Sequence, residues 1–278
     1  VPGGRADRPD RRARAADPDR EVALTLAAQG LTLTVPGRTL VKDLDLSLAT
    51  GQCWALLGRN GAGKSSLLLA LAGLSRPSSG AVLLDDRPLA AHPRRDVARR
   101  LGILLQHDAE DFWGSVLEFV LLGRLPHGSG LVGADPEGVA QAHAAIDAVD
   151  LLAHADQLYR TLSGGERQRA RIAQLLVQSP DYLLLDEPLS HLDLQHQLEL
   201  MQLLAGLARA GRTVVMALHE PLWAARFCDT ALLMYDSGAF RQGAVHDVLN
   251  QDNLESLYHC RLEAIAGSGA SLYLPVPS

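Results

Sequence analysis

The stretch from residue 52 to residue 74 constrains the fold more than any other part of the chain. It begins with the continuous apolar run QCWALLG, passes through the glycine-rich segment RNGAG and continues as KSSLLLALAGL, which has the composition of a helix. An apolar strand that turns through glycines directly into a helix is typical of a parallel sheet with helices on both faces. The sequence therefore predicts an α/β fold built on a parallel sheet.

Residues 58–65, GRNGAGKS, match the G-x-x-x-x-G-K-[ST] pattern of phosphate-binding loops. Glycines let the backbone N–H groups turn inward around phosphate oxygens, and the helix that follows directs its positive end at the same charge. We expect Lys64 to contact the β- and γ-phosphates of ATP, and the Ser65 hydroxyl to ligate Mg²⁺. A glycine turn that merely connects strand to helix is the alternative, and the match of both flanks disfavours it. The predicted ATP-binding residues are Gly58, Asn60, Gly61, Gly63, Lys64, Ser65 and Ser66.

A second apolar run, YLLLDE at residues 182–187, ends in two acidic residues. Alone, such a run is most often a strand that reaches a solvated loop. Next to a phosphate loop, Asp186 is suited to hold Mg²⁺ through its water shell, and Glu187 to orient and deprotonate an attacking water. The pair of acids therefore predicts phosphoryl transfer to water.

The segment LSGGERQRA at residues 162–170 has the features of a second anion site. Ser163 precedes Gly164 and Gly165, and an arginine-rich helix follows. Neutral donors and a helix N-terminus suit a γ-phosphate without adding like charges. A domain that already holds one nucleotide has little reason to build a second full pocket nearby. We therefore expect these three residues to cover a nucleotide that is bound by another subunit.

Composition excludes several classes of function. Hydrophobic residues make up 47% of the chain and charged residues 21%, and the net charge of −6 argues against a general nucleic-acid binder, so we expect no nucleic-acid partner. No run approaches the roughly 18 apolar residues of a membrane span. The isolated cysteines Cys53, Cys228 and Cys260 suggest neither a disulfide framework nor a CxxC metal site, which fits a reducing compartment.

The order of the patterns divides the chain into parts. Residues 1–20 hold six arginines and four aspartates and are expected to form a disordered, solvated tail. Residues 21–47 alternate as three short strands, VALTLAA, LTLTV and LDLSL, of an antiparallel sheet. The pattern turns helical between about 107 and 160, which predicts an inserted helical subdomain. Residues after 250 predict a final helix and a strand pair that complete the sheet domain, with 261–278 as a C-terminal extension.

LSGGERQRA, the phosphate loop and the acidic strand together resemble the motifs of ABC-type ATPases, and further motifs follow in that family's order. Gln106 stands where the family has its Q-loop glutamine, SHLD at residues 190–193 resembles the D-loop, and His219 in ALHE is similar to the switch histidine. The resemblance covers roughly residues 22 to 260. It implies a P-loop NTPase (RecA-like) core with an N-terminal antiparallel β subdomain and an inserted α-helical subdomain, the whole spanning residues 21–260.

The resemblance also implies how two copies of the chain would work. It implies a head-to-tail homodimer with two ATP molecules, each lying between the phosphate loop of one subunit and the Ser163–Gly165 segment of the other. In that arrangement His219 contacts the γ-phosphate, and Gln106 senses Mg²⁺ or water. The D-loop residues Ser190 and Asp193 link the two sites across the interface. The catalytic residues implied are Glu187, His219 and Gln106, and the Mg²⁺ ligands are Ser65, Gln106 and Asp186.

Three positions depart from the family pattern. An aromatic residue that stacks on adenine is usual about where Val35, Pro36 and Gly37 stand, so base stacking is in doubt there. Leu189 occupies a position where Thr or Ser is usual, which alters the hydrogen bonds of the D-loop. Glu220 follows His219 where Asp is common.

Two segments indicate the kind of ABC machine. SVLEFVLLGRLPH at 115–127 and LLLDEPLSHLDLQHQLEL at 183–200 resemble the ATPases of metal-chelate importers, which take up ferric siderophores, haem or cobalamin. For the first segment an amphipathic helix that Pro126 ends is the plain alternative. The importer hypothesis implies separate transmembrane permease subunits as partners and an indirect link to a substrate-binding protein. It also implies a peripheral location on the cytoplasmic face of the inner membrane. An ABC exporter ATPase and a soluble ABC ATPase such as a cofactor-assembly scaffold remain as alternatives.

Overall fold

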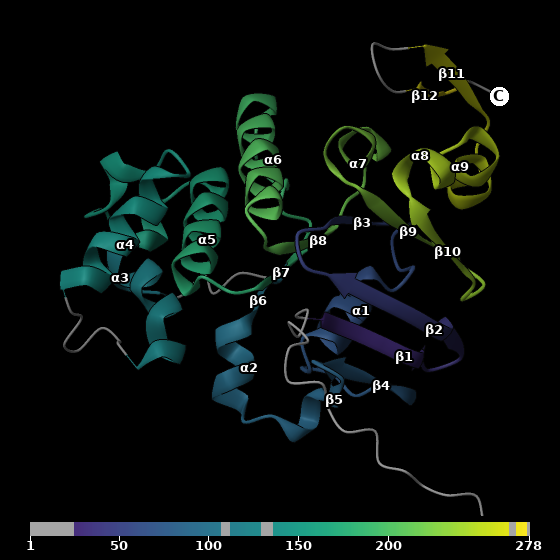
Figure 1. The fold of residues 1–278 in the computed structure, drawn as a ribbon. Coiled ribbons are helices and arrows are strands. Elements are labelled where there is room, and N and C mark those ends of the chain that lie inside the picture. The colour runs from purple at the N-terminus through teal and green to yellow at the C-terminus, as the bar shows by residue number, and fades with distance from the viewer. Residues whose placement is uncertain (1–24, 107–111, 129–135, 267–270, 277–278) are drawn as a thin grey trace, which may run out of the picture.

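A six-stranded sheet forms the centre of the structure, a computed structural model that describes residues 25–106, 112–128, 136–266 and 271–276 (Figure 1). The strands β6, β7, β8, β3 and β9 are parallel to their neighbours, and β10 at the edge is antiparallel to β9. In spatial order these strands are β10 (Phe240–Ala244), β9 (Thr230–Met234), β3 (Cys53–Leu57), β8 (Thr213–Ala217), β7 (Tyr182–Asp186) and β6 (Leu101–Leu104). The predicted parallel sheet is confirmed.

The central strands are buried on both faces, which is why they are continuous apolar runs. Every residue of β3, β7 and β8 is buried. Side chains at alternate positions belong to two different cores: Trp54 and Leu56 pack towards the antiparallel sheet, whereas Cys53, Ala55 and Leu57 pack towards the large helices. Parallel strands covered on both sides show this pattern in place of a polar and apolar alternation.

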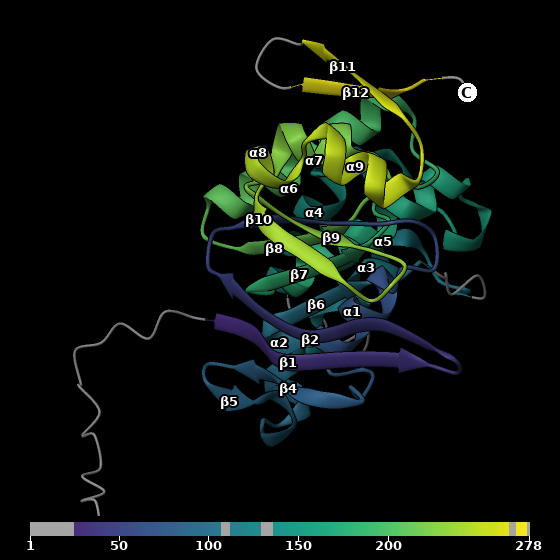
Figure 2. The same ribbon diagram turned by 90° about the vertical axis from the view of Figure 1, so that its right-hand side faces the viewer.

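A four-stranded antiparallel sheet in the order β2, β1, β4, β5 lies against one side of the molecule (Figure 2). Its strands are β1 (Thr25–Val35), β2 (Arg38–Ala49), β4 (Ser79–Leu84) and β5 (Arg87–Pro88). The prediction of separate strands for VALTLAA and LTLTV is wrong, because β1 runs without a break from Thr25, within the first segment, to Val35 at the end of the second, with a register shift between Ala28 and Leu31. At this irregularity Gly30 has a φ of 54°, and its N–H donates to Asp45 Oδ1 at 2.7 Å. Sequence patterns did not indicate that β4 and β5 join this sheet.

Helices cover both faces of the parallel sheet. Helix α1 (Lys64–Leu71) lies between the two sheets, where Leu67, Leu68 and Leu71 join the core shared with the antiparallel sheet. In the part of the chain that the structure describes, the opposite face is covered by five further helices (Figure 2). These are α5 (Gly164–Gln178), α6 (Leu194–Arg209), α7 (Pro221–Phe227), α8 (Val245–Val248) and α9 (Gln251–Tyr258).

A group of helices between β6 and α5 projects to one side of the sheet (Figure 1). Helix α2 (Arg94–Arg100) comes immediately before β6. After β6, helix α3 (Val116–Leu121) begins at a capping box in which Ser115 and Glu118 bind each other's backbone N–H groups. Helix α4 (Pro136–Asp147) packs with α3 against α5. Pro126 does not end an α-helix, because α3 ends at Leu121 and the chain continues as a 3₁₀ turn through the proline. These elements, with the two sheets, confirm the predicted fold class.

The C-terminal strands do not complete either sheet. Helix α9 contributes Leu254 and Leu257 to the large core, but β11 (Leu262–Ala266) and β12 (Ser271–Pro275) pair only with each other. The predicted strand pair is therefore present as a sheet of its own, and Leu262 and Tyr273 pack it against the large core. Among the described residues no helix is long and apolar enough to cross a membrane. The expected tail at 1–20 lies outside the described residues.

Candidate nucleotide-binding site

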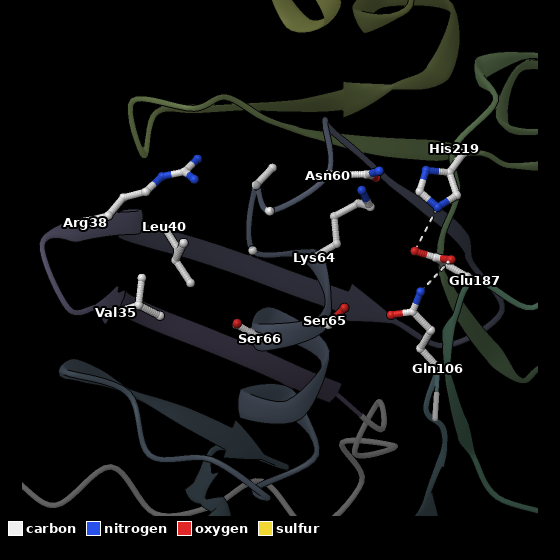
Figure 3. A pocket seen from close by; sticks show the side chains of 13 residues that line it. Val35, Arg38, Leu40, Asn60, Lys64, Ser65, Ser66, Gln106, Glu187 and His219 are labelled. Atoms are coloured by element: carbon white, nitrogen blue, oxygen red, sulfur yellow. Dashed lines mark hydrogen bonds and ion pairs between the residues drawn. The ribbon is translucent and has the colours of Figure 1, made fainter. Parts of the chain in front are cut away.

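A pocket of about 460 Å³ opens between the phosphate loop, the strand β2 and the ends of the strands β7 and β8 (Figure 3). Val35, Arg38 and Leu40 lie at one end of it, Gln106, Glu187 and His219 lie at the other, and Lys64 and the two serines lie between them. The lining residues are Val35, Arg38, Leu40, Asn60, Gly61, Ala62, Gly63, Lys64, Ser65, Ser66, Gln106, Glu187 and His219. Of the expected ATP-binding residues, only Gly58 does not line this pocket.

Close packing explains why the loop is rich in glycine. A Cβ atom on Gly58 would lie 2.7 Å from the carbonyl oxygen of Met234. Gly63 has a φ of 103°, and a Cβ there would lie 2.9 Å from the Cβ of Leu40. Both positions therefore require glycine, one because of neighbouring backbone and one because of its own backbone conformation.

Lys64 is buried at the start of α1, with 6% of its surface exposed. Its ammonium group donates to the carbonyl oxygens of Gly58 at 2.7 Å and Arg59 at 3.3 Å. Burial lowers the pKa of Lys64, while the nearby carboxylates of Glu187 and Asp186 act in the opposite direction. A cation that is held in place by the loop's own carbonyls and poorly solvated is well suited to meet a phosphate anion.

Asp186 is the most deeply buried acid of the pocket region, with 3% of its surface exposed. Its Oδ1 atom has no hydrogen-bond partner among the described residues. Burial raises the pKa of Asp186, and a hydrogen bond with Ser65 partly offsets this effect. An unpaired carboxylate oxygen beside a hydroxyl group is a donor set that a hard cation prefers, so Asp186 and Ser65 fit Mg²⁺.

Glu187 is held by side chains from three segments. His219 Nε2 lies 2.8 Å from Glu187 Oε1, and Gln106 Nε2 donates to Oε2 at 3.1 Å. The Ser190 hydroxyl lies 3.4 Å from the same Oε2. Glu187 itself has a φ of 51° immediately after β7, in the left-handed region that non-glycine residues rarely adopt. Glu187 thus contacts both of the other residues expected to be catalytic, His219 and Gln106.

The Ser163–Gly165 segment lies outside this pocket. Ser163 caps α5: its hydroxyl accepts from the N–H of Glu166 at 3.3 Å, and its own N–H donates to Glu166 Oε2 at 2.7 Å. Ser163 and Gly164 are exposed, and a Cβ on Gly165 would lie 2.8 Å from the carbonyl oxygen of His191. One chain therefore presents this helix start to its surface and does not bring it to its own phosphate loop.

The D-loop residues make local contacts in the single chain. Besides the contact of Ser190 with Glu187, Asp193 caps α6, because its Oδ1 accepts from the N–H of His196 at 2.9 Å. Asp193 Oδ1 also lies 2.9 Å from the Nδ1 atom of the same histidine. The structure thus gives both residues a role within the chain, and their expected role between chains stays a prediction.

The family resemblance placed the adenine-stacking position about Val35, at the far end of the pocket, but no motif pointed to Arg38 or Asp236 there. Arg38 lines the pocket there, and its Nη2 lies 3.2 Å from Asp236 Oδ1, while Arg59 of the phosphate loop lies 2.8 Å from Asp236 Oδ2. A hydrogen bond from Arg59 is the main cause that lowers the pKa of Asp236, and a hydrogen bond with His259 and the charges of Arg59 and Arg38 act in the same direction. No motif links residues so far apart in the sequence. The residue itself, an arginine three positions after Val35, was the only signal in the sequence for Arg38.

Comparisons with known proteins agree with this geometry. A model of the family described as ABC transporter matches residues 41–190. The hemin import ATP-binding protein HmuV of Myxococcus xanthus is 40% identical over 248 residues, which cover 87% of this chain and 92% of that protein. Its counterpart in Pseudomonas aeruginosa is 40% identical, with 84% and 92% covered. A chain of a transporter described as metal-chelate type, in an inward-facing conformation, superposes with a TM-score of 0.77 at 28% identity, covering 91% of this chain and 98% of its own.

Proposed function

Because the chain belongs to the ABC transporter family and is an ATPase of that family, we propose that it energises the import of hemin or a related metal chelate through separate permease subunits. The single observation that carries the ATPase chemistry is the contact of Glu187 with both Gln106 and His219 in the pocket that also contains Lys64. The importer assignment is supported by relatives named for hemin import at about 40% identity.

We assign the hydrolytic roles to residues of one pocket. Glu187 orients the attacking water and accepts its proton, and His219 and Gln106 fix the carboxylate from two sides. Lys64 neutralises charge on the β- and γ-phosphates. Asp186, Ser65 and Gln106 would hold Mg²⁺, which supplies further neutralisation of phosphate charge when it is bound. Each of these residues lines the pocket or lies directly behind it.

The exposed start of α5 supports a composite site in a homodimer. Ser163 and Gly164 are exposed, and neither lines the chain's own pocket. A helix N-terminus with neutral donors is suited to bind an anion that another molecule presents. In the proposed head-to-tail dimer, Ser163–Gly165 of each chain contacts the γ-phosphate bound by its partner. Two ATP molecules then hold the dimer together, and hydrolysis weakens it.

The far end of the pocket is suited to the adenine base. Val35 and Leu40 supply apolar surface where an aromatic residue is usual in the family, and Arg38 lies beside them (Figure 3). A guanidinium group stacks on flat π systems, so Arg38 can take over part of the stacking. The phosphates must lie at Lys64, and the base is therefore directed to this end.

Trp113 is the best candidate contact for a permease. It is 70% exposed, and its ring centroid lies 4.2 Å from the guanidinium carbon of Arg160. Leu158, two residues before Arg160, is also exposed. Phe112, in contrast, packs edge-on against Phe119 and Tyr159 at 5.4 and 6.1 Å and belongs to the helical core. Tryptophan and arginine are both enriched at protein interfaces, so we propose that the exposed Trp113 and Arg160 contact the permease. Binding there would place the chain on the cytoplasmic face of the membrane.

The experiment that tests the importer assignment is affinity purification of the tagged chain from gently solubilised native membranes, followed by mass spectrometry. We expect a permease with many membrane spans, and ATP hydrolysis by that complex that increases when a hemin-loaded substrate-binding protein is added. Recovery with soluble partners alone would favour an assembly scaffold, and a permease that needs no binding protein would favour an exporter. W113A should weaken recovery of the permease, whereas the control L74A, at another exposed apolar side chain, should not.

A further inference from the structure

The two catalytic segments that meet at Glu187 are also joined behind the pocket. Gln106 donates to the carboxylate of Glu187 at 3.1 Å, and the main-chain oxygen of Glu187 accepts from Gln168 Nε2 at 3.4 Å. Arg171 Nη1 donates to Gln168 Oε1 at 3.0 Å, and Arg171 Nη2 donates to the carbonyl oxygen of Leu105, the neighbour of Gln106. These contacts close a ring that returns to its starting residue.

The two side chains that complete this ring come from one face of α5. Gln168 and Arg171 are three positions apart, which brings them together on a helix. Gln168 is only 4% exposed, and its amide also donates to the carbonyl oxygen of Pro188 at 3.0 Å. Both amide hydrogens therefore point at the backbone that follows β7. A buried amide with its donors and acceptor all engaged has a single allowed orientation.

Arg171 provides the link to the other catalytic segment. A guanidinium group presents several donors in a fixed planar arrangement, so it can bind a side-chain oxygen and a main-chain oxygen at once. Here these are Gln168 Oε1 and the oxygen of Leu105, at the end of β6. The position of Gln106 is thereby set relative to the rigid helix and not only by its own contact with Glu187.

We propose that Arg171 and Gln168 are positioning residues for ATP hydrolysis, which hold Gln106 and Glu187 in the relative placement that catalysis requires. The proposal rests on the proposed function, because it takes Glu187 to be the residue that orients water. Neither residue lines the nucleotide pocket, so their loss should affect turnover and leave nucleotide binding intact. Displacement of a catalytic group by about 1 Å can cost on the order of 10²-fold in rate.

Gln168→Glu is the sharpest variant. It keeps the shape of the side chain and an acceptor for Arg171, but it replaces the two amide donors with a carboxylate that faces the carbonyl oxygens of Glu187 and Pro188. Arg171→Ala removes the link to Leu105, and Arg171→Lys keeps the positive charge on a single donor nitrogen in place of the planar guanidinium. Gln174→Ala is the matched control, because Gln174 lies on the same helix outside the 162–170 segment and its amide donates to the main-chain oxygen of Phe119 at 3.0 Å instead.

Steady-state ATP hydrolysis, thermal unfolding and binding of a fluorescent ATP analogue are measured for each purified variant. We expect kcat to fall roughly tenfold or more in Q168E and R171A, with KM and analogue affinity within about twofold of wild type. R171K should recover part of the rate, and Q174A should keep the wild-type kcat. The proposal is overturned if Q168E and R171A match Q174A in kcat, or if KM rises in step with any loss of rate.

The Glu187→Gln variant separates this failure from failure of the proposed function. If E187Q hydrolyses ATP as fast as wild type, Glu187 is not the residue that activates water, and the proposed function is wrong. If E187Q is inactive while Q168E and R171A have wild-type kcat, only the positioning role of the ring is wrong.

Discussion

His219 Nε2 and Glu187 Oε1 lie 2.8 Å apart, at the carboxyl ends of two neighbouring strands. The parallel pairing of β7 with β8 places Asp186 opposite Ala217, and the N–H of Glu187 donates to the carbonyl oxygen of Ala217 at 3.2 Å. The register of the sheet therefore brings together a carboxylate and an imidazole that are far apart in the sequence.

The first prediction concerns this pair. His219→Ala should lower kcat for ATP hydrolysis on the order of 10²-fold, because Glu187 loses the contact that fixes one of its oxygens and the γ-phosphate loses a donor. His246→Ala is the control, since His246 is 82% exposed and far from the pocket lining. Steady-state hydrolysis at saturating Mg·ATP measures both. A kcat for H219A within twofold of the control would show that the imidazole has no catalytic role.

The second prediction concerns the binding of the adenine base. Arg38→Ala should weaken ATP binding roughly two- to fivefold, as expected for about 0.5–1 kcal/mol of cation–π stacking at an exposed site. The affinity of the Arg38→Ala protein for inorganic tripolyphosphate should not change, because the phosphates bind at the other side of the pocket. Calorimetry with both ligands measures the difference, and Arg241→Ala on the exposed edge strand is the control. Equal weakening of both ligands would place Arg38 at the phosphates instead.

The third prediction uses the burial of Asp186. Burial raises the pKa of this acid, so its ionisation opposes folding, and the cost appears as the pH rises through the ordinary range of an aspartate. Asp186→Asn should abolish hydrolysis and yet stabilise the nucleotide-free protein at neutral pH, raising Tm by roughly 2–4 °C if about 1 kcal/mol is relieved. Asp247→Asn, at a 70% exposed carboxylate, should change neither quantity. A lower Tm for D186N in the absence of nucleotide would contradict this account.

The fourth prediction concerns acid stability. A hydrogen bond from Arg100 holds the pKa of Asp85 below its ordinary value. The stabilisation is therefore complete above the ordinary aspartate pKa, near 4, and is lost as the pH falls through the lower folded value. Asp85→Asn tolerates the positive φ of 51° at this position and removes the charge. Denaturant unfolding should show a loss for D85N at pH 7 that shrinks towards pH 3, and a loss that is independent of pH would contradict it.

The parts of the fold that were predictable are those set by local chemistry. The phosphate loop, the buried strands β3, β7 and β8, and the capped start of α5 at Ser163 each follow from a short pattern with one physical meaning. The same holds for the acids at 186 and 187, which follow β7 directly. A catalytic role for Gln106 was expected only from the family resemblance, and its contact with Glu187 was not predicted, since no local pattern relates the two.

The parts that were not predictable depend on long-range contacts. The irregularity at Gly30 allows one long strand where alternation suggested two, and its stabilising partner Asp45 lies on the next strand. The pairing of Arg38 with Asp236, and of Arg171 with the carbonyl of Leu105, joins segments that are brought together only by the complete sheet. Side chains of this kind have no periodicity of their own.

The central claim is that two copies of the chain form a composite site around ATP. Its most direct test is the molar mass of the Glu187→Gln protein in saturating Mg·ATP, measured by light scattering for the protein by itself and for the protein mixed with its permease. The account predicts a dimer, twice the 29.8 kDa chain, that retains two ATP molecules. Adding Ser163→Asp should keep the chain monomeric without loss of Tm, because Asp caps a helix as well as Ser but places a negative charge at the partner's γ-phosphate. An E187Q protein that stays monomeric under both conditions, or an S163D/E187Q protein that dimerises equally well, would contradict the composite site.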